Sequence, residues 1–357
     1  MQVVNTCTEC GVPEYISSEH LWHNSGFIVQ KRDQRHIVTF IENDNLNALF
    51  QGVEDIVGTS IERIILATRR RAGRAYMDRI IPKGVRELVQ KGELELGNLV
   101  DAFFVIGHVL GYGRFELVDY RYERDDDDFF LVRVEKPYSI LLGSVDPAAA
   151  IEALIGVDLG FTYEETSPGV YDIRVFRESH PEEYKGRLMM RAYEHDQGDI
   201  DLEICPACGA PRALSAFRWD LEKGLINNRY NGRRMVFFAP TVLDAVFGEL
   251  EKELGEGINE TVIEAQRRFT VAFYSPDDVV DEAGFRKAIA LRGIGNLRRL
   301  EMESSGLNMR MDNAAMHLLM AGLFQGFFEI AYEVESTVQW ELSENGSLEL
   351  EVSPSKR

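Results

Sequence analysis

The chain has 357 residues, which is more than one typical domain needs and enough for two. Hydrophobic residues make up 45% and charged residues 27%, as in ordinary globular proteins, so each half can bury its own core. The net charge of −20 disfavours direct contact with nucleic acid, and no apolar run approaches the roughly 20 residues of a membrane helix.

The chain begins with MQVVNTCTECGVPEY, which lacks the basic start and apolar stretch of a secretory signal, so we expect a cytoplasmic protein. Two short strands rich in β-branched and aromatic residues are predicted next, at 26–30 and 35–40. Apolar residues at helical spacing then predict helices at about 45–57, 61–76 and 99–110.

The chain then changes to short apolar segments bounded by turns. They predict a hairpin of strands at 114–122 and 129–136, followed by a short helix at 148–154. A second hairpin is predicted from strands at 161–165 and 171–176, with SPG as its turn. This order indicates an α+β fold, with helices in the middle and an antiparallel sheet at the end.

Two charge clusters lie within these elements. The basic cluster Arg69, Arg70, Arg71 and Arg74 has a helical pattern, and we interpret it as a solvated helix face. Contact with an anionic ligand or partner is the alternative for this cluster. The acidic run from 125 to 128 is interpreted as a solvated hairpin tip, because four consecutive carboxylates point in different directions and cannot all reach one ion.

The second half of the chain repeats the first. Each half begins with CxxCGxP and continues with a tryptophan, a glycine beside apolar residues, an apolar strand and an amphipathic helix ending in glycine. Cys7 and Cys205 are 198 positions apart (205 − 7), and Trp22 and Trp219 are 197 apart (219 − 22). Near the ends of the two repeats the offset falls to 177, because the first repeat has a longer middle.

The repeat predicts two domains of the same α+β class, at 1–176 and 201–357. Each contains a CxxCG zinc knuckle, a helical middle and an antiparallel sheet. The segment 177–200 contains RESHPEEYKG and EHDQGDID, which are polar and glycine-rich, so we expect a linker there.

All four cysteines belong to the two knuckles, as Cys7 with Cys10 and Cys205 with Cys208. Two thiolates at this spacing can bind one ion from a tight turn, and the following glycine permits the positive φ that the turn often needs. Four thiolates fill a tetrahedral zinc sphere and leave no position for a catalytic water. We therefore predict one structural zinc shared by both knuckles. Buried free thiols, a redox-active pair and an iron centre are the alternatives.

A resemblance to the 4-vinyl reductase domain family, described as predicted hydrocarbon-binding proteins, is carried by several segments. They are FQGVEDIVGTSIERIILATRRRAGRAYMDRI, GHVLGYGRFELVDY, FLVRVEKPY, AAAIEALIG and TYEETSPGVYDIRVF. The resemblance covers about 45–176 and, more weakly, 243–352. It implies an α+β fold like that of vesicle-tethering subunits, often dimeric, around an apolar pocket. Members of the family are sensory domains for aromatic effectors or handle tetrapyrroles.

The sequence departs from this family in its cysteines. Many members carry zinc-binding cysteines near the last hairpin, whereas neither TSPGVYDIRVF nor LSENGSLELEV contains one. The family's metal ligands therefore have no counterpart here. We expect the two knuckles to crosslink the chain through zinc in place of the family's cysteines.

We expect a small-molecule-binding or sensory protein with a structural zinc site. Phe103, Phe104, His108 and Tyr112 are the candidate lining of an apolar pocket between the helix at 99–110 and the sheet that follows, with plain core packing as the alternative. An enzyme acting on a tetrapyrrole or aromatic substrate is a second hypothesis. It is disfavoured because no nucleophile–base pair, P-loop or open metal site is seen. A third hypothesis is that the protein is an adaptor subunit, which forms a homodimer or binds a partner protein.

Overall fold

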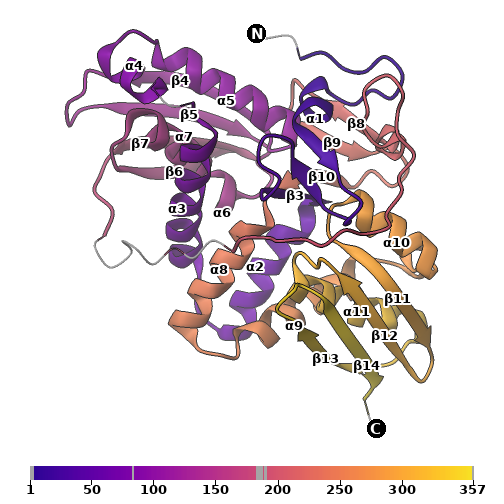
Figure 1. Cartoon of the computed structure of the whole chain (residues 1–357). Coiled ribbons are helices and arrows are strands. Elements are labelled where there is room, and N and C mark those ends of the chain that lie inside the picture. Colours follow the sequence, from indigo (N-terminus) through magenta and orange to yellow (C-terminus); the bar gives the residue numbers. More distant parts are fainter. Residues whose placement is uncertain (1–3, 83, 182–187, 189–190, 356–357) are drawn as a thin grey trace. The chain divides into compact units, whose positions relative to one another are not determined.

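The computed structural model describes residues 4–82, 84–181, 188 and 191–355 (Figure 1). The chain forms two compact units, and each unit contains segments from both halves of the sequence. Unit 1 consists of Met1–Thr6, Glu62–Met190 and Phe217–Val236. Unit 2 consists of Cys7–Ile61, Arg191–Ala216 and Phe237–Arg357.

Unit 1 is built on a four-stranded antiparallel sheet in the order β4-β5-β7-β6. Its strands are β4 (Arg114–Arg121), β5 (Phe129–Glu135), β6 (Leu159–Ser167) and β7 (Val170–Arg177), with β8 (Phe217–Asp220) and β9 (Leu225–Asn228) outside that sheet. Its helices are α3 (Glu62–Ile80), α4 (Val85–Lys91), α5 (Leu96–Leu110), α6 (Ile140–Gly143) and α7 (Asp146–Ile155). Every second residue of β5, at 130, 132 and 134, is buried in the core of this unit.

Unit 2 is built on a second four-stranded antiparallel sheet, in the order β11-β12-β14-β13. Its strands are β11 (Asn296–Glu303), β12 (Gly306–Asp312), β13 (Ser336–Leu342) and β14 (Leu348–Pro354), with β1 (His20–Trp22), β2 (Ile28–Gln30) and β3 (Ile37–Glu42) in a separate antiparallel run. Its helices are α1 (Glu14–Glu19), α2 (Asn43–Val57), α8 (Pro240–Leu254), α9 (Ile258–Phe273), α10 (Glu282–Leu291) and α11 (His317–Tyr332). Helix α9 packs against both α2 and α11. Strand β10 (Arg234–Phe238) begins in unit 1, pairs there with β9 and ends in unit 2.

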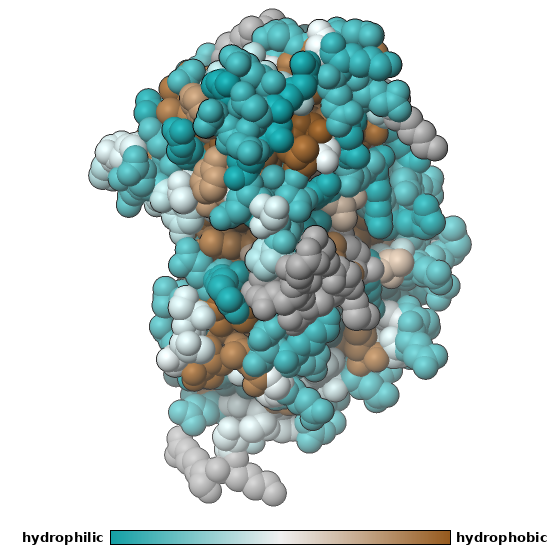
Figure 2. All heavy atoms as spheres, turned by 90° about the vertical axis from the view of Figure 1, so that its left-hand side faces the viewer, coloured by the Kyte–Doolittle hydropathy of each residue, from teal (hydrophilic) through white to brown (hydrophobic). Residues whose placement is uncertain are grey.

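The two sheets confirm the predicted α+β class and have equivalent strand orders. The register of the sequence repeat also holds in the structure. Helices α7 and α11 end 177 positions apart (332 − 155), and strands β6 and β13 begin 177 apart (336 − 159). Among the described residues, no helix has the length and apolarity needed to cross a membrane. On the face drawn in Figure 2, hydrophobic residues form separate patches among hydrophilic ones.

Each unit joins the tryptophan of one repeat to a helix end of the other. In unit 2 the indole N–H of Trp22 donates to the carbonyl of Leu291, at the end of α10, at 2.9 Å. In unit 1 the indole N–H of Trp219 donates to the carbonyl of Val109, near the end of α5, at 3.1 Å. Equivalent tryptophans therefore make equivalent contacts, and each contact joins the two repeats.

The segment that we predict as a linker is partly described. Residues 182–187 and 189–190 lie outside the described residues. The part after Met190 belongs to unit 2 and is hydrogen-bonded to it. There the backbone N–H of Asp196 donates to the side chain of Asn313 at 3.0 Å, and the side chain of Tyr193 is 4% exposed. The domain boundaries at 176 and 201 follow the sequence repeat and stay a prediction.

Candidate metal centre and ligand cleft

The two knuckles have the same backbone geometry. In the first, the N–H of Gly11 donates to the carbonyl of Cys7 at 2.9 Å, and in the second the N–H of Gly209 donates to the carbonyl of Cys205 at 2.8 Å. Gly11 and Gly209 have φ angles of +75° and +77°, which a residue with a side chain rarely adopts. The glycine in CxxCG therefore has the role that the sequence predicts for it.

The structure brings the four cysteine sulfurs together. The Sγ atoms of Cys7 and Cys205 are 3.9 Å apart, and those of Cys10 and Cys208 are 3.5 Å apart. All four sulfurs lie within 4.8 Å of one another, and none forms a disulfide. A tetrahedral ion with bonds of about 2.3 Å to sulfur needs sulfurs about 3.8 Å apart. The cluster therefore fits one four-coordinate metal ion with soft ligands.

The thiols differ in how readily they ionise. The backbone N–H groups of Cys10 and Glu9 face the Cys7 sulfur, and they lower the pKa of the Cys7 thiol to about 7. Burial raises the pKa of the Cys10 thiol to about 12 and also raises that of Cys208. Metal binding requires the thiolate form, so a bound cation would compensate the cost of ionising these buried sulfurs.

The predicted ligand residues Phe103 and Phe104 lie on α5 beside the sheet of unit 1. Phe104 is 6% exposed, belongs to the hydrophobic core and has its ring centroid 5.5 Å from that of Phe115. Phe103 is partly buried and packs against the same core. Both side chains therefore contribute to core packing.

The other two predicted ligand residues make polar or stacking contacts. His108 Nε2 accepts a hydrogen bond from the N–H of Phe115 at 2.8 Å, and burial lowers the pKa of His108. The ring of Tyr112 lies 4.5 Å from the ring of Tyr138. The four predicted residues line neither the cleft between α3 and β6 nor the hollow on the sheet of unit 2, which are described next. A pocket lined by these four residues therefore stays a prediction.

A cleft of about 650 Å³ lies in unit 1 between α3 and β6. One wall is a stripe of α3 at positions 63, 66, 67, 70 and 71. These positions follow the i, i+3, i+4, i+7, i+8 spacing of a single helix face. The opposite wall contains Phe161 and Tyr163, and His180 also lines the cleft. A second hollow, of about 400 Å³, lies on the sheet of unit 2 and is lined mainly by charged and other polar residues.

The basic cluster on α3 is not a solvated helix face, so that interpretation was wrong. Arg69 pairs with Asp146 at 2.5 Å, and its side chain is 10% exposed. Arg74 pairs with Asp158 at 2.7 Å. The reason is that α7 and the segment after it pack along α3 and bring carboxylates to this helix.

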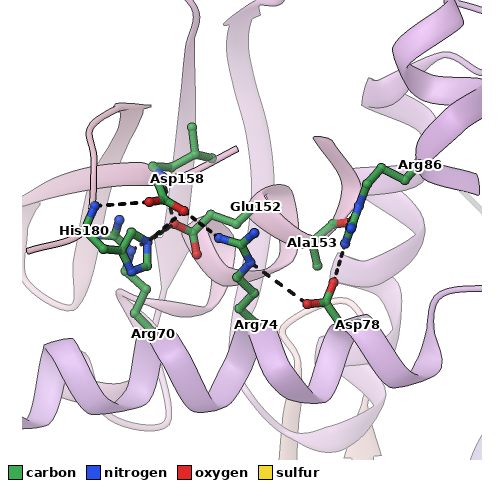
Figure 3. A network of polar contacts seen from close by, with 9 residues as sticks. Arg70, Arg74, Asp78, Arg86, Glu152, Ala153, Asp158 and His180 are labelled. Carbon is green, nitrogen blue, oxygen red and sulfur yellow. Dashed lines mark hydrogen bonds and ion pairs between the residues drawn. The ribbon is translucent and has the colours of Figure 1, made fainter. Parts of the chain in front are cut away.

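Arg70 connects the cleft to a buried network, shown in Figure 3. Its Nε lies 3.1 Å from Oε1 of Glu152, a residue with no solvent exposure. The same oxygen is 2.5 Å from Nε2 of His180 and accepts the N–H of Leu159 at 2.7 Å. Glu152, Asp158 and His180 could together offer ligands to a cation. However, the guanidinium groups of Arg70 and Arg74 already supply positive charge to the two carboxylates, so this is an ion-pair network.

The acidic hairpin tip is solvated only in part. Asp128 is 1% exposed, and its carboxylate accepts the N–H of Glu123 at 2.7 Å and pairs with Arg177 at 2.9 Å. Asp125 is exposed and pairs with Arg121. The last carboxylate of the run therefore organises the turn, because it accepts the N–H groups that the tight backbone leaves without strand partners.

No protein-family model matches the chain, and no curated protein matches it. Among solved structures, a Cs H-NOX mutant with 4-cyano-L-phenylalanine at site 5 is 14% identical, with 35% of this chain and 78% of that chain covered and a TM-score of 0.25. A point mutant of T. Tengcongensis H-NOX is 14% identical, with 33% and 75% covered and a TM-score of 0.24. An oxygen-binding H-NOX domain related to soluble guanylate cyclases is 15% identical, with 32% and 71% covered and a TM-score of 0.22.

Proposed function

We propose that this protein binds a small hydrophobic or aromatic molecule in the cleft between α3 and β6, in a sensory role. The observation that carries the proposal is the cleft itself. Its volume of about 650 Å³ falls within the range of roughly 300–1,000 Å³ that small-molecule sites occupy. Leu66, Ala67 and Phe161 give it apolar walls, and aromatic rings suit a flat ligand. The resemblance of residues 45–176 to the 4-vinyl reductase domain family points to the same role.

The groups around the cleft favour binding over catalysis. The hydroxyl of Tyr163 donates to Glu62 at 2.6 Å, and His180 is held by the buried Glu152. Among the described residues that line the cleft, none forms the nucleophile–base pair that covalent catalysis needs. The arrangement can orient a ligand without reacting with it.

We also propose that the four cysteines hold a structural zinc ion. Among the described residues, the group that could hold the ion here consists of four cysteine sulfurs, and four thiolates close the tetrahedral sphere. The ion would tie residues 7–10 to residues 205–208 and so fix both knuckles in unit 2. Four free thiols also suit a reducing compartment, so we propose a cytoplasmic location.

A fluorescence titration with the neutral probe N-phenyl-1-naphthylamine tests ligand binding in this cleft. Substitution Ala67→Trp places a large ring on the α3 wall, and we expect it to weaken probe binding at least about tenfold, because overfilling removes the space that the probe needs. Ala283→Trp, at an exposed position of α10, is the matched control and should leave binding unchanged. If Phe104→Ala changes binding and Ala67→Trp does not, the site lies beside α5 instead.

A further inference from the structure

We infer that the ligand of this cleft is an amphipathic anion, with a flat apolar body and one carboxylate or similar head group. The inference rests on the proposed function and adds the charge of the ligand. Its starting point is the charge of the lining. Three arginines and two glutamates line the cleft, and the buried Glu152 balances the charge of Arg70, in a chain whose net charge is −20. The cleft is therefore close to neutral on a strongly acidic protein, which favours an anion there more than elsewhere on the chain.

Arg63 is the arginine most available to a ligand. It lies on the first turn of α3, is exposed, and forms no ion pair with the residues that the structure describes. The neighbouring Glu62 is engaged, because it accepts the hydroxyl of Tyr163 at 2.6 Å. A guanidinium in this position can bind a carboxylate through two parallel hydrogen bonds.

Arg70 is held rigidly at the other end of the same stripe. Its Nε lies 3.1 Å from the fully buried Glu152, which also contacts His180 (Figure 3). Its Nη2 is buried and has no hydrogen-bond partner among the described residues. Because Glu152 fixes the guanidinium from one side, Arg70 loses little further freedom when a ligand binds. Arg70 thus contributes a positioned guanidinium to the lining of the cleft.

The apolar residues lie between these two charges. Arg63 and Arg70 are seven positions apart on α3, which is two helical turns or about 10 Å. Leu66 and Ala67 occupy the turn between them on the same helix face. Phe161, on the facing wall, supplies an aromatic surface. An anion bound at either arginine would therefore have its apolar body beside Leu66 and Ala67. An amphipathic ligand thus matches both the arginines and the apolar residues of the lining.

Two fluorescent probes with the same aromatic body separate charge from hydrophobicity. They are 1-anilinonaphthalene-8-sulfonate, an anion, and the neutral N-phenyl-1-naphthylamine. We expect the wild-type chain to bind the anion more tightly. Substitution Arg63→Gln should weaken binding of the anion roughly three- to tenfold and leave the neutral probe within about twofold, since the lost interaction is a charge-assisted hydrogen bond at a partly solvated site.

The control variant is Arg218→Gln, which removes an exposed arginine of β8, outside the cleft, and should change neither affinity. Thermal melts of both variants establish that they are folded. If both probes bind wild type equally and Arg63→Gln changes neither, the ligand is not an anion, while the proposed function stands as long as Ala67→Trp blocks the neutral probe. If neither probe binds in a way that Ala67→Trp abolishes, the inference and the proposed function both fail.

Discussion

At the scale of single residues, the four cysteines make a direct prediction about metal content. We expect one zinc per purified chain by elemental analysis, because all four sulfurs lie close enough to share one ion. Cys7→Ser and Cys205→Ser should each remove most of the zinc. The double variant should lose little more stability than either single one, since either change opens the same site.

Glu9→Gln is the control for these variants, because Glu9 lies beside the site without being one of its four sulfur ligands. Its zinc content should equal that of wild type. Two ions per chain, or iron in place of zinc, would contradict the shared structural zinc site. Additive losses of stability in the double variant would show that the two knuckles act independently.

Asp244 gives a residue-scale prediction about pH. Burial raises the pKa of its carboxyl group to about 6, although the hydroxyl of Tyr193, at 2.6 Å, and the positive charge of Arg191 oppose this shift. The folded protein therefore keeps the proton more tightly than the unfolded chain. The stability that this provides is complete below about pH 4 and is lost as the pH rises through about 6.

Substitution Asp244→Asn removes this titration and keeps a group that can hydrogen-bond to Tyr193. Relative to wild type, we expect the variant to gain roughly 2–3 kcal/mol of unfolding free energy between about pH 4 and pH 7, as the wild-type carboxylate becomes charged in its buried site. Urea denaturation at a series of pH values measures the difference. A difference that does not change with pH would show that Asp244 titrates normally.

At the scale of elements, the contact of α11 with α9 depends on glycine. A Cβ at Gly326 would lie 2.6 Å from the Cβ of Thr270, and one at Gly322 would overlap the backbone of Ile263. The helices pack closely here because these positions have no side chains. We expect Gly326→Ala to destabilise the protein by about 1–3 kcal/mol, because the helices must move apart.

Gly248 is the matched control, since it also lies in a helix of unit 2 and has open space around it. Gly248→Ala should stabilise the protein by roughly 0.5–1 kcal/mol, because alanine has the higher helix propensity. Chemical denaturation of both variants gives the comparison. Equal effects of the two substitutions would mean that the α9–α11 contact is looser than the structure shows.

Most elements of the first repeat could be predicted because their signals are local. The apolar stripe predicts a helix at 45–57, and α2 spans Asn43–Val57; the hairpin predicted at 114–122 and 129–136 corresponds to β4 and β5. Helix α4 was not predicted. It has seven residues between Gly84 and Gly92, so it offers barely two turns of periodicity.

The candidate sites differ in how far the sequence could predict them. The clustering of the four cysteines could be predicted, because each knuckle is a local motif and the repeat identifies its partner. The partners of the arginines on α3 could not. Asp146 is 77 positions from Arg69, and Asp158 is 84 from Arg74, so only the packing of α7 on α3 brings them together. For the same reason the cleft, whose walls are about 100 positions apart in sequence, has no local signal.

At the scale of the whole molecule, the repeats are interleaved. Unit 2 contains the knuckle and helix α2 of the first repeat together with most of the second repeat. Helix α2 packs on α9 and buries Leu46, Leu49, Phe50 and Val53 completely. Full burial of an apolar side chain contributes about 1.5–3 kcal/mol, so these four contribute on the order of 6–12 kcal/mol. That amount is comparable to the entire stability of a typical domain, about 5–15 kcal/mol.

This magnitude predicts how the two halves of the chain behave when they are separated. We expect a fragment of residues 191–357 to be insoluble or to unfold without a cooperative transition, because the face of α9 that packs against α2 would be exposed. Co-expressed with residues 1–190, it should become soluble and copurify, since the first fragment supplies α2 and the first pair of cysteines. Size-exclusion chromatography and thermal melting of both preparations measure this. A monomeric 191–357 fragment with a sharp melting transition would instead show that the second repeat folds by itself, as the sequence boundary at 201 predicts.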